Sequence, residues 1–196
     1  LSLAKQVIIV GDEKQTSPEN VGLNRARVFE IMDDHLRNVR GYRTLFDPDN
    51  SLYDIARQRF TKSVMLVEHF RCLPDIIKFS NARFYNDEIQ PLRDRPPMLD
   101  WQPLGAVRVL DGYRSGDVNR PEAEAVVELL ARLDADPMYD GMTFGVVTLL
   151  SGGQAQLIDT LLLDRLTPER YRARDLQVGE AAAFQGAERD VMVVSL

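Results

Sequence analysis

The sequence predicts an α/β fold built on a parallel sheet, and three observations support that class. Short, continuous apolar runs rich in β-branched residues recur along the chain, and such runs indicate strands buried on both faces. Segments with one apolar side at helical spacing lie between them, and this alternation is typical of α/β proteins. The apolar runs occupy residues 7–10, 107–110, 144–150 and 191–196.

Three helices are marked by their ends and by their apolar stripes. The clearest begins at Asn119, a suitable cap; Pro121 fits the first turn, and Glu122 is placed to bond back to the cap. Its apolar side is formed by Ala123, Val126, Val127, Leu130 and Ala131. The other two helices are expected at residues 74–85 and 154–166.

Two segments lack such patterns. Residues 16–62 have poor periodicity and many turn residues, which indicates a connector between two packed units or an irregular part of the first. Residues 94–97 contain two prolines and are expected to form a surface loop.

The composition is that of an ordinary globular protein, with 44% hydrophobic and 28% charged residues among 196. A single cysteine excludes an internal disulfide and fits a reducing compartment, so a cytoplasmic location is expected. No stretch approaches about 20 apolar residues, so no membrane segment is predicted. The formal net charge of −6 argues against indiscriminate coating of nucleic acid, although it allows a local basic channel.

Residues 184–190 form a loop rich in charge and glycine that leads directly into the last apolar run. Loops of this kind carry polar groups to the edge of an α/β sheet, where ligands bind. An ordinary surface loop has the same composition, so this remains the alternative interpretation.

Asp12 and Glu13 follow the first apolar run and resemble a pair of carboxylates that could hold magnesium. Such a site also needs a phosphate loop of the form G-x-x-x-x-G-K-[ST], which these 196 residues do not contain. The chain therefore cannot hold a nucleoside triphosphate by that route.

Arg71 stands just before a predicted helix among aromatic and apolar residues, which suits a guanidinium that binds phosphate in a partly buried cleft. His69 and Cys72 raise the alternative of a metal or thiol site. A zinc site needs three or four ligands and thiol catalysis needs an orienting third group, so no metal site is predicted.

Four motifs stand in an order that resembles the superfamily 1 helicases of the up-frameshift type, the DNA2/NAM7-like group. They lie at residues 7–18, at 68–74 with the following helix, at 145–148 with Gln154, and at 184–188. The resemblance covers motifs III to V, and the residues of these motifs resemble those of bacterial members more than those of eukaryotic members. It implies RecA-like domains of the P-loop NTPase type that couple ATP hydrolysis to 5′-to-3′ movement on single strands.

The resemblance implies two catalytic residues. Gln15 matches the motif III glutamine that senses the γ-phosphate and the attacking water from the first domain. Arg71 matches the motif IV arginine that reaches the γ-phosphate from the second domain and stabilises charge on the transferred group. Alternatively, Gln15 only caps a turn.

The resemblance also implies binding residues. Gly186 and Glu188 match motif V, where backbone and carboxylate meet the phosphates and sugar hydroxyls, and Asp12 is assigned to the nucleotide with them. Thr148 matches a threonine that contacts the nucleic-acid backbone. Alternatively, Glu188 is a solvated loop charge and Thr148 an ordinary strand residue.

The chain departs from the group in two motifs. Eukaryotic members read Gln-Tyr-Arg-Met-His-Pro where this chain has residues 69–74, and they read Thr-Pro-Tyr at residues 148–150. Phe70 keeps the packing of the first tyrosine without its hydroxyl. Leu150 replaces an aromatic residue able to stack on a base or sugar, which puts that contact in doubt.

On this basis residues 1–60 are expected to be the end of the first RecA-like domain with a connector, and residues 61–196 the second domain, truncated before motif VI. Such a fragment is expected to be inactive alone, with ATP and Mg²⁺ bound mainly by the missing N-terminal part, and the parent to bind single-stranded DNA or RNA. The alternatives are a non-catalytic RecA-like module and the motor part of a nuclease.

Truncation also has a structural consequence. The strand expected at residues 7–10 would lack its neighbours, so it must find a substitute edge or leave apolar surface exposed. A non-native dimer contact or disorder in residues 16–62 is the expected result.

Overall fold

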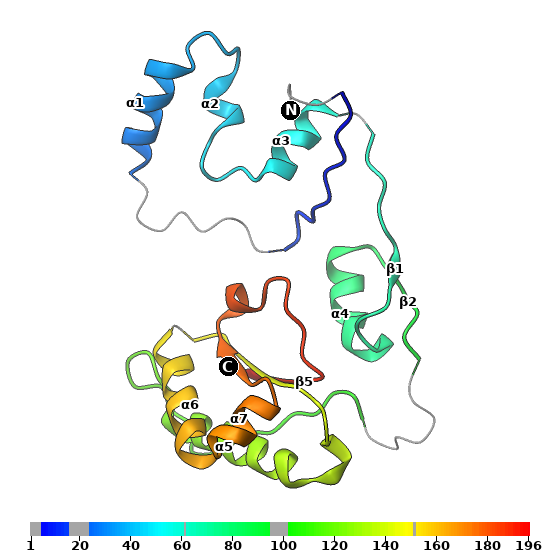
Figure 1. Cartoon of the computed structure of the whole chain (residues 1–196), viewed down its shortest axis with the longest axis vertical. Coiled ribbons are helices and arrows are strands. Elements are labelled where there is room, and N and C mark those ends of the chain that lie inside the picture. Colours follow the sequence, from blue (N-terminus) through cyan, green and yellow to red (C-terminus); the bar gives the residue numbers. More distant parts are fainter. Residues whose placement is uncertain (1–4, 16–23, 61, 95–101, 151) are drawn as a thin grey trace. The chain divides into compact units, whose positions relative to one another are not determined.

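The computed structural model describes residues 5–15, 24–60, 62–94, 102–150 and 152–196 (Figure 1). The chain divides into two compact units, Leu1–Gly105 and Ala106–Leu196. The boundary between RecA-like domains expected near residue 60 remains a prediction. Among the residues described, none of the helices combines the length and apolarity needed to span a bilayer.

The second unit is built on a three-stranded parallel sheet with the order β4-β3-β5. The central strand β3 (Phe144–Thr148) pairs with β4 (Gln177–Gly179) on one side and β5 (Val191–Ser195) on the other. The parallel α/β class is therefore confirmed, and two of the four predicted runs form strands within their expected ranges.

The helices of this unit are α5 (Arg120–Ala135), α6 (Gly152–Arg165) and α7 (Pro168–Ala173), with the short 3-10 helices η1 (Pro137–Tyr139) and η2 (Ala181–Phe184). The Asn119 side chain caps α5 by accepting a bond from the Glu122 backbone N–H at 3.3 Å. Glu122 bonds back to the side-chain amide of Asn119 (2.9 Å) and not to its backbone N–H. The reason is that this N–H donates to Gln154 Oε1 at 2.8 Å.

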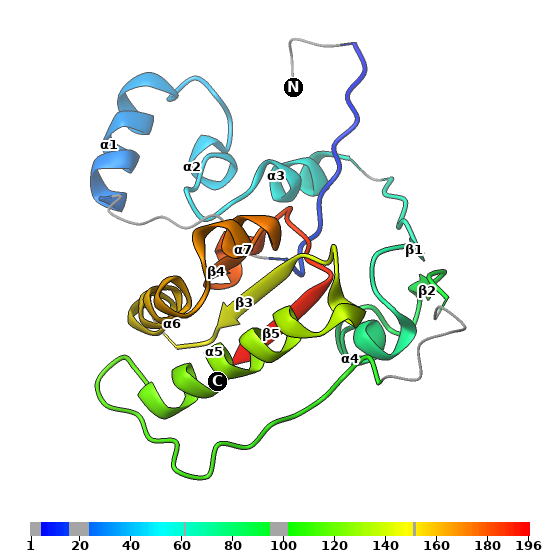
Figure 2. The same ribbon diagram turned by 60° about the horizontal axis from the view of Figure 1, so that its bottom comes forward.

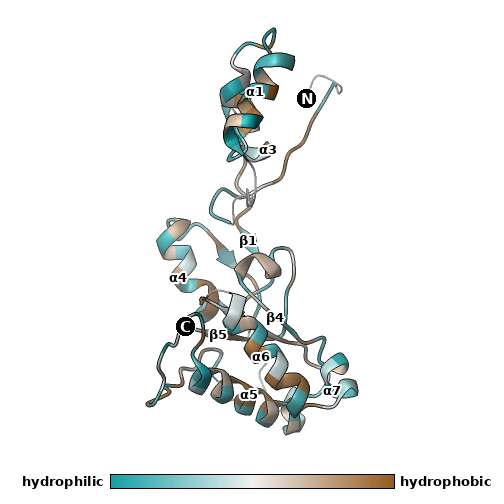
Figure 3. Cartoon of the chain, turned by 90° about the vertical axis from the view of Figure 1, so that its left-hand side faces the viewer, coloured by the Kyte–Doolittle hydropathy of each residue, from teal (hydrophilic) through white to brown (hydrophobic). Residues whose placement is uncertain are grey.

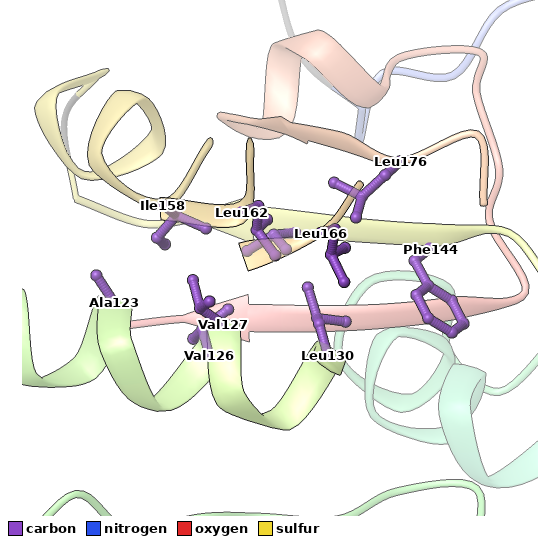
Figure 4. Packing of buried hydrophobic residues seen from close by; sticks show 10 residues of the cluster. Ala123, Val126, Val127, Leu130, Phe144, Ile158, Leu162, Leu166 and Leu176 are labelled. Atoms are coloured by element: carbon purple, nitrogen blue, oxygen red, sulfur yellow. The ribbon is translucent and has the colours of Figure 1, made fainter. Parts of the chain in front are cut away.

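The apolar sides of α5 and α6 pack on one face of the sheet, and Figure 2 shows α5 crossing in front of β5. Along both helices, brown and teal residues alternate in Figure 3, as expected of helices with one buried side. Each fully buried aliphatic side chain contributes about 1.5–3 kcal/mol. The buried cluster (Figure 4) consists of Ala123, Val126, Val127, Leu130, Phe144, Val146, Ile158, Leu162, Leu166 and Leu176.

A buried ion pair lies beside this cluster. The side chains of Arg174 and Asp134 are 5% and 7% exposed, and Arg174 Nε lies 2.7 Å from Asp134 Oδ1. The Arg174 guanidinium also donates to the backbone carbonyls of Asp134 and Tyr139, and it lies 4.8 Å from the centroid of the Phe144 ring. Arg170 binds the second carboxylate oxygen at 2.7 Å. These bonds join the end of α5 to α7 and to Arg174, the residue that follows α7.

On the opposite face of the sheet, η2 packs against β3 and β4, and glycines in these two strands lie beneath it and the residues after it. A Cβ on Gly179 would lie 2.7 Å from the Cβ of Ala183 in η2. A Cβ on Gly145 would lie 2.6 Å from Met192 Sδ and 3.0 Å from the Phe184 ring. The glycines therefore let the segment 181–190 lie flat against the sheet.

We expect Gly179→Ala to lower the free energy of unfolding of the chain by about 1–3 kcal/mol, because the added methyl forces η2 away from β4. Chemical denaturation measures this loss, and the double variant Gly179→Ala/Ala183→Gly should recover part of it. Gly105→Ala is the matched control, since a Cβ there would meet nothing within 4 Å. Equal stability of Gly179→Ala and the wild type would contradict the close packing of η2.

In the N-terminal part of the first unit, residues 24–60 form three helices, α1 (Arg25–His35), α2 (Tyr42–Leu45) and α3 (Leu52–Arg59). After them β1 (Glu68–His69) and β2 (Gln90–Pro91) form a two-stranded parallel sheet connected by α4 (Pro74–Phe84), which confirms the helix predicted there. The buried side chain of Asn81 in α4 pairs with the backbone N–H and C=O of Ile89, at 3.0 and 2.8 Å. This pairing holds the segment that leads into β2 against the helix.

Three expectations are wrong for the described residues. No strand forms at residues 7–10 or 107–110; Ile8 is 93% exposed and Leu110 86% exposed, because no neighbouring strand pairs with either run in the part of the chain described. Residues 24–60 are not irregular, because they contain α1, α2 and α3. The side chain of Asn24 caps the start of α1, and the side chain of Ser51 caps the start of α3. Residues 16–23, 61 and 95–97 lie outside the described residues.

Candidate nucleotide site and nucleic-acid interface

The loop at residues 184–190 turns at Gly186, whose φ is +79°. A side chain at this φ is strained, and a Cβ on Gly186 would meet no other atom of the described chain within 4 Å. The glycine is therefore required by the backbone conformation and not by crowding. Its backbone and the side chain of Glu188 are both exposed.

Arg189 anchors this loop to the sheet, although the sequence analysis did not single it out. Its side chain, 12% exposed, donates to the backbone carbonyls of Asp175 and Glu188, both at 2.7 Å, and to Gln177 Oε1 at 2.9 Å. A charge in a polar loop is usually solvated, so only its tertiary partners reveal this anchoring role.

Asp190 fastens the other end of the loop. Its Oδ2 accepts bonds from the backbone N–H and the hydroxyl of Thr143, each at 2.8 Å, and its own N–H donates to the Thr143 hydroxyl at 3.0 Å. Because Thr143 immediately precedes β3, the loop of Gly186 and Glu188 is held at the amino ends of the strands.

Thr148 lies at the opposite edge, at the carboxyl end of β3. Phe144 and Thr148 are about 13 Å apart along the strand at about 3.3 Å per residue, so the structure does not bring Thr148 together with Gly186 and Glu188. The Thr148 side chain is buried, at 2% exposed, and its hydroxyl donates to the Leu150 carbonyl at 3.3 Å.

Gln154, which belongs to the same motif as Thr148, is fully buried at this carboxyl edge. Its side-chain amide donates to the Asn119 carbonyl and to Ser195 Oγ, both at 3.2 Å, while its oxygen accepts from the Asn119 N–H. Gln154 thereby joins the starts of α5 and α6 to the end of β5. Its observed contacts are structural.

The first unit contains Asp12, Gln15 and Arg71. Asp12 organises its turn: it accepts bonds from the Lys14 backbone N–H at 2.9 Å, from the Gln15 side-chain amide at 3.1 Å and from the Tyr85 hydroxyl at 2.6 Å. Partial burial acts to raise the pKa of Asp12, but these hydrogen bonds outweigh it and hold the pKa below its ordinary value. The same environment, burial first and then Asp12, raises the pKa of Tyr85 to about 12.

Arg71 lies on the turn between β1 and α4, and its side chain is exposed. The backbone N–H of Cys72 donates to His69 Nε2 at 3.0 Å, and the Arg93 guanidinium donates to the Arg71 carbonyl at 2.6 Å. His69 is thus bonded to the backbone of the turn. In the part of the chain described, no group of three or more His, Cys, Asp or Glu side chains could hold a metal ion.

Taken one by one, these groups have chemistry that suits a nucleotide. A guanidinium and a glycine backbone N–H can bind phosphates, and a carboxylate can accept from sugar hydroxyls. The sequence has no phosphate loop with its lysine, and the described residues offer no cluster of metal ligands.

The fold defines the class, a RecA-like α/β domain with a parallel sheet. The chain belongs to the AAA domain family and, within it, to the superfamily 1 helicases of the up-frameshift type: the family model matches residues 48–196, about three quarters of the chain.

Two curated relatives extend this similarity over the chain. The 5′-3′ DNA helicase ZGRF1 of Mus musculus is 26% identical over 199 residues, which cover 97% of this chain and 10% of the mouse protein. The regulator of nonsense transcripts 1 homolog of Neurospora crassa is 26% identical over 207 residues, 97% of this chain and 17% of that protein. The chain thus spans less than a fifth of either relative. The closer resemblance of the motif residues to those of bacterial members remains a prediction.

Proposed function

We propose that this chain is the C-terminal ATPase portion of a longer ATP-dependent helicase or translocase that acts on single-stranded nucleic acid. The observation that supports this best is the order of four motifs along the chain, three of which lie within the family match that covers residues 48–196. Arg71 and Gln15 are the proposed catalytic residues, and the remaining side of the site belongs to sequence outside these residues.

In this proposal ATP, bound with Mg²⁺, is the substrate, and its γ-phosphoryl group is transferred to water. This hydrolysis drives two RecA-like domains to open and close. Arg71 stabilises the charge that develops on that group, and Gln15 orients the attacking water. Asp12 keeps Gln15 in its turn through the hydrogen bond between their side chains. Gly186 and Glu188 offer an open backbone and a carboxylate to the phosphates and the sugar.

For nucleic acid, Thr148 and the residues after it at the carboxyl edge of β3 are the proposed contact. Leu149 is 62% exposed there, in a position where an apolar side chain can meet a sugar or a base face. One relative is named a DNA helicase and the other a regulator of nonsense transcripts, so both DNA and RNA are to be tested.

The test is ATP hydrolysis by the full-length protein, with and without single-stranded DNA and RNA. We expect turnover that one of the two strands stimulates, and no turnover above background from the 196-residue chain alone. Hydrolysis by the chain alone would contradict the division of the site. A full-length protein that binds strands without hydrolysing ATP would favour the non-catalytic module, and strand cleavage would favour the motor of a nuclease.

A further inference from the structure

His69 closes the turn that carries Arg71. The bond from the Cys72 N–H to His69 Nε2, at 3.0 Å, joins residues 69 and 72 and encloses Phe70 and Arg71 between them. A nitrogen that accepts a bond has a free lone pair, so the ring is neutral and its proton is on Nδ1. The turn in this form depends on an uncharged imidazole.

The histidine itself is fixed in place. Its backbone carbonyl accepts from the Leu92 N–H at 2.8 Å, which ties it to the strand pairing of β1 with β2. The Arg93 guanidinium also donates to the Arg71 carbonyl at 2.6 Å. The His69 ring, the paired strands and Arg93 therefore all restrain the backbone around Arg71.

The surroundings favour the neutral ring. Burial first, and then the positive charge of Arg71, lower the pKa of His69 below its ordinary value of 6.5. Charged side chains on the surrounding segments include Glu68 on β1, Arg71 on the turn and Arg93 after β2. On and after α4 they are Asp75, Lys78, Arg83, Asp87 and Glu88.

We propose that His69 is a positioning residue that holds Arg71 in its working orientation through the neutral Nε2, and that a proton on this ring releases the turn. A protonated ring has N–H groups at both nitrogens, so a donor would face the Cys72 N–H and the turn would open. The inference rests on the catalytic role proposed for Arg71.

Three variants of the full-length protein test it through the pH dependence of kcat. In His69→Gln the amide oxygen can accept from Cys72 at any pH, so kcat should stay near the wild-type value at neutral pH. The wild-type kcat should fall relative to His69→Gln by about tenfold for each pH unit below the pKa of His69. His69→Leu has no acceptor and should lower kcat at every pH. His35→Gln, at the other histidine of the chain, should keep the wild-type profile.

A second measurement does not depend on activity. In NMR spectra of the 196-residue chain, the Cys72 amide should shift with the same pKa as the His69 ring, and this shift should vanish in His69→Gln. The inference would be overturned if the chemical shift of the Cys72 amide did not change as His69 is protonated. It would also be overturned if wild type and His69→Gln had identical pH profiles of kcat while Arg71→Ala lowers kcat. An Arg71→Ala variant with normal kcat would instead remove the proposed function of Arg71, even where the Cys72 amide titrates as expected.

Discussion

Arg71→Ala in the full-length protein is expected to lower kcat for ATP hydrolysis by about 10³-fold or more, with little change in KM for ATP. The physical reason is that such an arginine stabilises charge that appears only in the transition state, so its loss affects turnover and not ground-state binding. Steady-state ATPase kinetics at saturating single strand measure both constants.

Two further variants sharpen this result. Arg71→Lys keeps a positive charge but loses the planar fork of donors, so we expect an intermediate kcat. Arg83→Ala removes an exposed arginine from the last turn of α4 and should leave kcat unchanged. Wild-type turnover in Arg71→Ala would exclude this residue from the mechanism.

Asp134→Ala is expected to lower the free energy of unfolding of the 196-residue chain by about 3–5 kcal/mol, measured by chemical denaturation. The variant removes the buried carboxylate from the Arg174 guanidinium, 5% exposed, and leaves it only the exposed carboxylate of Asp140 at 3.8 Å. The double variant Asp134→Leu/Arg174→Met removes both charges and should recover most of the loss, which keeps the test informative where the single variant does not fold.

A surface pair provides the control for this prediction. Glu124 and Arg120 form an exposed pair at 2.9 Å on α5, and Glu124→Ala should cost only about 0.3–0.5 kcal/mol. If Asp134→Ala costs no more than this control, the buried pair contributes nothing specific to stability.

The effect of Asp134 should also depend on pH. Desolvation acts to raise the pKa of Asp134, but hydrogen bonds from Arg170 and Arg174 outweigh it and hold the pKa below its ordinary value of 3.8. The carboxylate therefore contributes its full stability above pH 3.8, and the contribution is lost as the pH falls through the folded pKa. The difference in stability between wild type and Asp134→Ala should accordingly shrink in acid.

Local signals predicted the C-terminal half of the fold well. Asn119, Pro121 and the apolar stripe after them predict α5, because a cap and a periodic apolar face are properties of neighbouring residues. The runs at 107–110 and 144–150 look alike in sequence, but only the second forms a strand. An apolar run reports a tendency to be buried and does not identify the strand that must pair with it.

In the candidate site, too, some features can be predicted from the sequence and others depend on the tertiary structure. The motifs at residues 7–18, 68–74, 145–148 and 184–188 can be recognised without coordinates, because side-chain chemistry and order along the chain are enough. Arg189 could not be predicted, since its partners at Asp175 and Gln177 are brought to it by the pairing of β4 with β3. The separation of Thr148 from Gly186 also depends on strand direction.

The sequence by itself determined the α/β class, the helices α4, α5 and α6, the family and the residue types available for phosphate chemistry, because each depends on short-range pattern. Only the tertiary structure decided which runs pair, that Gly145 and Gly179 make room for the segment 181–190, and that His69 accepts a bond from the turn of Arg71. The physical reason is that hydrogen bonds and close packing depend on which groups meet in space. These groups are often far apart in the sequence, so the local pattern around each residue does not identify its partner.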